Sequence, residues 1–171
     1  FSMKLNHLIL KNIFRVFGGY SKKKSRFRIL NVHDILDNDF DKLEKILINL
    51  KKNWEFIDPL KLNELDNRID KNYLLLTFDD GYKSQKIFAD KILNKHNIKA
   101  IFFVVTNFLN CKDQNEAKEF VFKNIDTNIK GNLDRYKEVN NMKNEDLLNL
   151  KYNNHVIGSH TVNHKKLTKI K

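Results

Sequence analysis

The chain has 171 residues, of which 41% are hydrophobic and 31% charged, and it contains a single cysteine, Cys111. This composition predicts one soluble globular domain and excludes an intrachain disulfide framework. No window of 18 apolar residues is present, which excludes a membrane-spanning helix. The formal net charge is +11. However, the lysines are scattered apart from the run SKKKSRFR at 21–28, so we interpret the charge as a solvated surface and do not expect a nucleic-acid partner.

Residues 1–25 are predicted to form a separate amphipathic and basic segment. A helix is expected at its start, because one face would carry apolar residues and another basic ones: Leu5, Ile9, Ile13 and Val16 against Lys4, Lys11 and Arg15. Such a helix could rest on an anionic membrane, although we favour packing on the domain's own core. No signal peptide is expected, since Lys11 and Asn12 break the apolar run. We therefore expect a cytoplasmic or membrane-peripheral protein.

The remaining residues, 26–171, are predicted to form one domain in which strands alternate with helices. Apolar periodicity predicts strands at 26–33, 73–78, 99–106 and 155–160, and helices at 40–53, 84–97, 116–125 and 144–153. Residues 54–67 read as a short strand and a helical turn, with Asp58 and Pro59 as an N-cap and first-turn pair. The 99–106 strand is apolar throughout, which is typical of a strand buried on both faces. The pattern predicts an α/β fold with largely parallel strands.

Two adjacent carboxylates, Asp79 and Asp80, follow the strand 73–78 in the stretch LLLTFDDGYKS. A second polar cluster, GSHTVNHKKL at 158–167, begins at the carboxyl end of the last predicted strand, just past residues 155–157. Ligands of parallel α/β proteins bind at the carboxyl ends of the strands. If the strands are parallel, both clusters therefore lie on the same rim.

His160 and His164 are four residues apart, which would bring both imidazoles to one side if the segment were helical. Two histidines and one carboxylate can hold a zinc-type ion and leave a position open for water. On this interpretation one aspartate binds the metal and the other accepts a proton from the water. The cation would also make two adjacent ionised carboxylates tolerable. The other histidines have no such spacing and are interpreted as ordinary residues: His7, His33, His96 and His155.

The stretches TFDDGY and IGSHTVNHKKL resemble the first two motifs of the polysaccharide deacetylase family, carbohydrate esterase family 4. DKILNKHNIKAIFFVV at 90–105 is similar to the helix and strand that follow the first motif, so the resemblance covers most of 29–167. The resemblance implies a distorted (β/α) barrel, a divalent metal ion such as zinc, and hydrolysis of N-acetyl groups from the amino sugars of a glycan. It also implies that Asp79 is the catalytic base and that Asp80, His160 and His164 are the metal ligands.

Three later motifs of the family have no counterpart. They supply an Arg that orients the base, an Asp and a Trp that line the site, and a His that protonates the leaving amine. Arg135 precedes the second motif and Trp54 precedes the first, so neither matches. We therefore expect the N-terminal half of the barrel, with the C-terminal strands missing and extra sequence at 107–141. Exposed sheet edges could then pair with a second copy or a complementing chain.

Three functions follow as hypotheses. The first is a metal-dependent carbohydrate N-deacetylase, and the second is a truncated, inactive homologue that binds metal or glycan. The third, a basic nucleic-acid-binding protein, rests on charge alone. The sequence leaves the sugar open among chitin-like oligomers, peptidoglycan, exopolysaccharide and lipid-linked sugars, and it leaves the choice between zinc and other divalent metals open.

Overall fold

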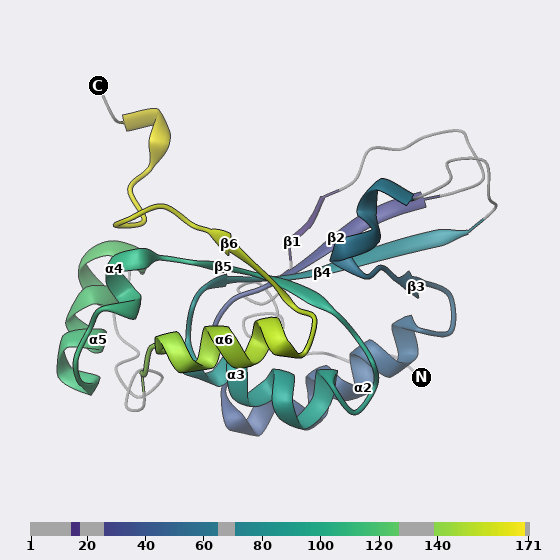
Figure 1. Ribbon diagram of the computed structural model, residues 1–171, viewed down its shortest axis with the longest axis horizontal. Helices are drawn as coiled ribbons and strands as arrows, with labels where there is room; N and C mark the ends of the chain where they lie inside the picture. The colour runs from purple at the N-terminus through teal and green to yellow at the C-terminus, as the bar shows by residue number, and fades with distance from the viewer. Residues whose placement is uncertain (1–14, 18–25, 65–70, 127–138, 170–171) are drawn as a thin grey trace, which may run out of the picture.

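The computed structural model describes residues 15–17, 26–64, 71–126 and 139–169, and it shows a twisted sheet with a layer of helices against one face (Figure 1). The strands are β1 (Arg15–Phe17), β2 (Arg26–Val32), β3 (Glu55–Phe56), β4 (Asn72–Asp80), β5 (Ala100–Val104) and β6 (Val156–Ser159). The α-helices are α2 (Phe40–Leu50), α3 (Lys83–Phe88), α4 (Thr106–Leu109), α5 (Gln114–Phe120) and α6 (Asn144–Tyr152). Shorter turns are 3₁₀-helical at Asp37–Asp39, Pro59–Glu64 and Leu167–Lys169 and π-helical at Ala89–Leu93 and Val121–Ile125.

The sheet confirms the predicted parallel α/β class. Its strand order is β1-β2-β4-β5-β6, with β3 paired to the start of β4. Strands β2, β4, β5 and β6 are parallel, and β1 runs antiparallel to β2. The register aligns Asp80 with Val104 and Val104 with Ser159. The carboxyl ends of β4, β5 and β6 therefore form one rim, as expected from the sequence.

One face of the sheet packs on the helices α2, α3 and α6 (Figure 1) and carries the main core. Alternate strand residues point into it, as the pleat requires. The buried side chains of the strands and of the three helices include Leu30, Val32, Leu74, Leu76, Phe78, Phe102, Leu43, Leu47, Phe88 and Leu150. Phe78 and Phe102 stack with their ring centroids 4.8 Å apart. This packing holds β4 and β5 together just below the rim.

The opposite face of the sheet is lined by the other alternate residues. The prediction that the 99–106 strand is buried on both faces is wrong, because Ile101 and Phe103 are only half-buried on this side. Together with Ile29 and Leu75 they line a cavity of about 360 Å³. The strand is apolar on both faces because one face meets the helices and the other borders this cavity.

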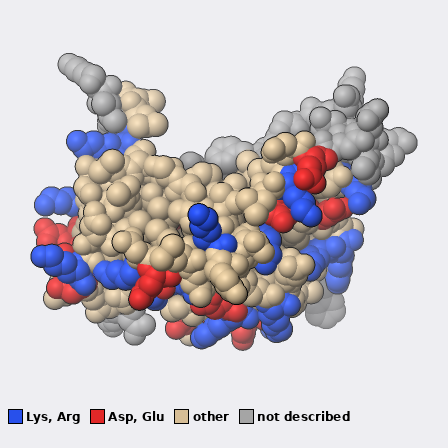
Figure 2. Space-filling model, in the orientation of Figure 1, with Lys and Arg blue, Asp and Glu red and all other residues tan. Residues whose placement is uncertain are grey.

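The helix predicted over the N-terminal residues is wrong at its end. Arg15–Phe17 is a strand that pairs antiparallel with β2. The other residues of that prediction, 1–14, and most of the basic run at 21–28 lie outside the described residues. On the face shown in Figure 2, basic and acidic side chains are interspersed over the helical layer. That distribution agrees with a solvated mixed surface. No helix in the part of the chain that is described is long and apolar enough to cross a membrane.

The element boundaries differ from the predictions in two places that matter for the site. Strand β4 continues to Asp80, two residues beyond the predicted end at 78, so Asp79 and Asp80 are its last two residues. The helix predicted at 84–97 is α3 followed by a π-helical turn that ends at Leu93. The predicted N-cap is confirmed, since Asp58 Oδ1 accepts a hydrogen bond of 3.0 Å from the Leu60 N–H.

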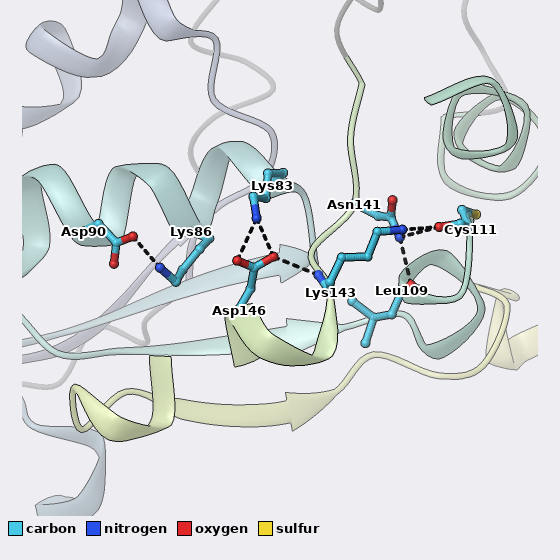
Figure 3. Close-up of polar contacts among 8 residues, drawn as sticks. All are labelled: Lys83, Lys86, Asp90, Leu109, Cys111, Asn141, Lys143 and Asp146. Atoms are coloured by element: carbon cyan, nitrogen blue, oxygen red, sulfur yellow. Dashed lines mark hydrogen bonds and ion pairs between the residues drawn. The ribbon is translucent and has the colours of Figure 1, made fainter. Parts of the chain in front are cut away.

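A network of polar contacts fastens the segment before α6 to the rest of the domain (Figure 3). Both carboxylate oxygens of Asp146 accept hydrogen bonds of 2.7 Å from Lys83 Nζ, and Oδ2 also accepts one of 2.9 Å from the Lys143 N–H. Asn141 Nδ2 donates to the carbonyl of Cys111 at 3.1 Å. The Cys111 thiol is buried, and burial raises its pKa, which disfavours the reactive thiolate.

His155 is a buried core residue whose protonation should destabilise the fold. Its Nδ1 accepts a hydrogen bond of 3.2 Å from the Ala100 N–H, and burial, aided by the Lys99 charge, lowers the pKa of His155 from 6.5 to about 4. The unfolded chain therefore binds the extra proton between these pH values. The free energy of unfolding should fall by up to about 3 kcal/mol from this group as pH drops from 6.5 to 4.

Chemical denaturation of the wild type and of His155→Gln across this pH range measures the effect. The difference between the two curves isolates His155 from other titrating groups. A difference that does not change with pH would contradict the expected loss.

Candidate active site

Asp79 and Asp80 end β4 in a backbone conformation that separates their side chains. Asp79 lines the cavity on the face of the sheet opposite the helices, which we call the open face, whereas Asp80 is buried and only 1% exposed. Asp80 has φ +83°, and Gly81 after it has φ +96°. A non-glycine residue rarely adopts positive φ, and such strained residues concentrate at functional sites. The sharp turn lets the chain leave the sheet and enter α3.

His160 and His164 lie on a loop after β6, so the helical arrangement considered for their i, i+4 spacing does not form. Thr161 and His164 have φ of +68° and +54°, so the loop curls through left-handed conformations. The two imidazole rings nevertheless meet, with centroids 5.0 Å apart. The loop is fixed to the neighbouring rim, because the His160 N–H donates to the Val104 carbonyl at 2.9 Å and the Thr106 N–H donates to the Thr161 carbonyl at 3.2 Å.

Three of the four residues singled out from the sequence converge around one point. Asp80 Oδ1 lies 3.6 Å from His160 Nε2 and 3.6 Å from His164 Nε2. One ligand atom from each of Asp80, His160 and His164 lies within 4.8 Å of the others. Two imidazole nitrogens and one carboxylate oxygen are a donor set that suits zinc.

The environment of Asp80 tests whether a cation fits. Both of its carboxylate oxygens are buried and accept no hydrogen bond from the described residues. Burial raises the pKa of Asp80 from 3.8 to about 7. The negative charges of Asp79 and Asp34 also raise this pKa, whereas the His164 charge lowers it. Burial likewise lowers the pKa of His160, which favours the neutral imidazole that a metal needs. A buried carboxylate without hydrogen bonds is costly unless a cation compensates it, so these residues fit a divalent ion.

Asp79 lies beside this donor cluster and is held by residues that the sequence did not single out. Asn31 Nδ2 donates to Asp79 Oδ2 at 2.7 Å, and His33 Nε2 lies 3.7 Å from the same oxygen. Gln85 Nε2 donates to the Asp79 carbonyl at 2.5 Å. His160 Nε2 is 4.0 Å from Asp79 Oδ2, so the carboxylate borders the cluster of Asp80, His160 and His164.

The register of the sheet explains why Asn31 reaches Asp79. Asn31 pairs with Thr77, two residues before Asp79 and on the same face of β4. The only sequence signal was a polar residue between apolar ones in the strand 26–32. That signal could be interpreted only after β2 was known to pair with β4. His33, interpreted as an ordinary residue, belongs to this rim for the same reason.

Gly81 is required by the turn that presents Asp80. A Cβ at this position would meet Val104 Cγ1 and Leu109 Cδ2 at 3.3 Å, and the positive φ is strained for any L side chain. Gly81→Ala should therefore lower the free energy of unfolding by about 1–2 kcal/mol. It should also weaken zinc binding, because Asp80 precedes it directly.

Denaturation in EDTA and zinc titration measure the two effects of Gly81→Ala separately. Asn154→Ala is the matched control, since Asn154 also has positive φ, +61°, but lies outside the site. The control should lose stability and keep its zinc affinity. Equal zinc affinity in both variants would contradict the role given to the turn.

Comparison with solved structures identifies the fold. The chain is similar to IcaB from Ammonifex degensii, with 20% identity and a TM-score of 0.55 over 78% of this chain and 52% of that one. It is also similar to the Streptococcus pyogenes deacetylase PplD, solved in complex with acetate, with 18% identity and a TM-score of 0.53 over 85% and 59%. The chain thus spans between half and three-fifths of these structures, and its open sheet corresponds to part of their (β/α) barrel. A search of curated proteins gave no match.

The family comparison covers the residues of the site. The sequence model described as "Polysaccharide deacetylase" matches residues 66–171, a range that includes Asp79, Asp80, His160 and His164. It therefore spans both motifs whose side chains meet at the rim. The chain belongs to the polysaccharide deacetylase family.

Proposed function

We propose that this chain carries the metal-binding and base-bearing part of a metal-dependent carbohydrate N-deacetylase. The observation that carries the proposal is the buried Asp80 carboxylate, which has no hydrogen bond from the described residues and faces two imidazole nitrogens at 3.6 Å. Family membership supplies the reaction class, hydrolysis of an acetylated amine on a glycan. The proposed substrate is accordingly an N-acetylated glycan.

Asp80, His160 and His164 would hold the ion, for which zinc is proposed because of the nitrogen-rich donor set. When bound, such an ion supplies Lewis acidity, which makes water a stronger acid and polarises a carbonyl oxygen. The residues keep the ion on the rim, where the cavity of the open face ends at Asp79 and His160. A sugar N-acetyl group at this end would lie next to both carboxylates.

Asp79 is the proposed general base. Asn31 Nδ2 donates a hydrogen bond of 2.7 Å to Asp79 Oδ2, so the carboxylate is oriented before substrate binds. In the reaction Asp79 accepts a proton as the water oxygen bonds to the acetyl carbon. The C–N bond then breaks, and the proton from Asp79 is available to the leaving amine. The acetic acid formed in this step passes its proton to the amine, so the products are acetate and the ammonium form of the amino sugar, and atoms and charge balance.

Acetate release from N-acetylglucosamine oligomers tests the proposal. The wild-type chain is assayed with added zinc, with EDTA, and after zinc is restored. We expect release that EDTA abolishes and zinc restores. Zinc binding without any acetate release would instead identify a homologue that binds metal without turnover. Acetate release unaffected by EDTA would contradict a metal-dependent enzyme.

A further inference from the structure

The second imidazole of the metal-binding group has a partner on its far side. His164 Nδ1 lies 3.0 Å from the carbonyl oxygen of Asn124, a residue 40 positions earlier in the chain. A carbonyl oxygen can only accept, so Nδ1 must carry the hydrogen. In a neutral imidazole the lone pair then resides on Nε2, the atom that lies 3.6 Å from Asp80 Oδ1. The contact therefore selects the tautomer that a metal requires.

Asn124 belongs to the π-helical turn Val121–Ile125 that continues α5. The Asp126 N–H donates to the Val121 carbonyl at 2.9 Å, five residues back, which is the wider spacing of a π-turn. Asn124 Nδ2 also donates to the Phe120 carbonyl at 3.0 Å. The extra residue in this turn determines the direction in which the Asn124 carbonyl points.

The helix beneath the turn is well anchored. The Asp113 side chain caps α5 by accepting hydrogen bonds of 2.9 Å from the N–H groups of Asn115 and Glu116. Phe120 stacks on the buried Phe108, with ring centroids 5.6 Å apart. Because α5 is capped and packed in this way, the Asn124 carbonyl is held in place and can keep the His164 imidazole in one orientation.

We propose that the π-turn Val121–Ile125 is a positioning element for the metal ligand His164, acting through the Asn124 carbonyl. This inference rests on the proposed function, since it concerns the same metal-binding group. It also gives a role to the stretch 107–141, which the sequence marked only as extra length. The described part of that stretch contacts the site through the hydrogen bond between His164 and the Asn124 carbonyl.

The tautomer of His164 in the metal-free wild-type protein tests the proposal directly. Nitrogen-15 NMR of the imidazoles at a pH where they are neutral distinguishes a protonated Nδ1 from a protonated Nε2. The His164 signal is assigned by its loss in His164→Gln. We expect Nδ1 to be protonated. A protonated Nε2 would overturn the proposal.

A deletion tests the effect on metal affinity. Lys123 is exposed in the π-turn, and removing it should convert the turn to an α-helical one and redirect the Asn124 carbonyl. The zinc dissociation constant should rise about 10–100-fold. Lys123→Ala is the matched control, because it loses the same ion pair with Glu119 but keeps the turn, and its zinc affinity should be unchanged.

The outcomes separate this inference from the proposed function. A folded deletion variant with wild-type zinc affinity would overturn the positioning role. Absence of zinc binding in the wild type would overturn the proposed metal site itself. If the deletion variant does not fold, the His164 tautomer decides the question.

Discussion

Asp80→Asn should abolish stoichiometric zinc binding, which we expect to be the largest effect of any single substitution in the site. The carboxylate is the one anionic member of the group of three, and its Oδ1 faces both imidazoles at 3.6 Å. An amide of the same shape removes the charge that attracts the ion while leaving His160 and His164 in place. Loss of an outer-shell partner already costs about 10–100-fold in metal affinity, so loss of the carboxylate ligand itself should cost about 100-fold or more, measured by calorimetric titration.

The same substitution should stabilise the metal-free protein at neutral and alkaline pH. Burial raises the pKa of Asp80 to about 7, so the folded chain keeps a proton that the unfolded chain releases from about pH 4 upward. The metal-free wild type should therefore lose stability as pH rises from 4 to 7, by up to about 4 kcal/mol. Asp80→Asn should remove that loss, because an amide does not ionise.

Denaturation in EDTA at pH 5 and pH 8 measures this dependence for both proteins. Asp37→Asn is the control, since Asp37 is an exposed carboxylate in the 3₁₀ turn Asp37–Asp39 and is not one of the residues that contact Asp80. If the difference in free energy of unfolding between the wild type and Asp80→Asn is the same at pH 5 and pH 8, ionisation of Asp80 does not destabilise the fold and the prediction is wrong.

Asp79→Asn should remove catalysis and keep the metal. Asp79 lies outside the group of three ligand atoms, with its Oδ2 held by Asn31 at 2.7 Å and 4.0 Å from His160 Nε2. An amide cannot accept the proton of the attacking water, so acetate release should fall about 10²–10⁴-fold. Zinc affinity should change little, because all three ligands remain.

The paired measurement of acetate release and zinc affinity separates the two aspartates. Asp79→Asn and Asp80→Asn are isosteric changes at adjacent positions, which makes each the natural control for the other. Loss of zinc in Asp79→Asn with retention in Asp80→Asn would reverse the assigned roles.

The sequence predicted both parts of the site, the two aspartates and the two histidines, because the residues of each part are close together in the sequence. The carboxylates at 79 and 80 and the histidines at 160 and 164 end strands whose apolar runs are plain, and parallel strands bring their ends together. The structure confirms that Asp80, His160 and His164 meet. It corrects the reason, since left-handed turns rather than a helix bring the two histidines together.

What the sequence could not predict depends on pairing between distant segments. Asn31 reaches Asp79 only through the β2–β4 register, and Asn124 reaches His164 only through the packing of α5. The periodic apolar pattern also led to a wrong prediction at Val16. The pattern predicts a helix there, but the residue lies in a strand because the chain pairs with β2. Association through the end strands β1 and β6, contact with a membrane surface and the boundary at residue 26 stay predictions.

The most direct test of the central claim is X-ray absorption at the zinc edge on the zinc-loaded wild-type chain. The account predicts one zinc ion per chain, with two imidazole ligands and the remaining scattering from oxygen. His160→Ala should show one imidazole fewer. A spectrum without imidazole scattering, or one dominated by sulfur from Cys111, would contradict the site built by Asp80, His160 and His164.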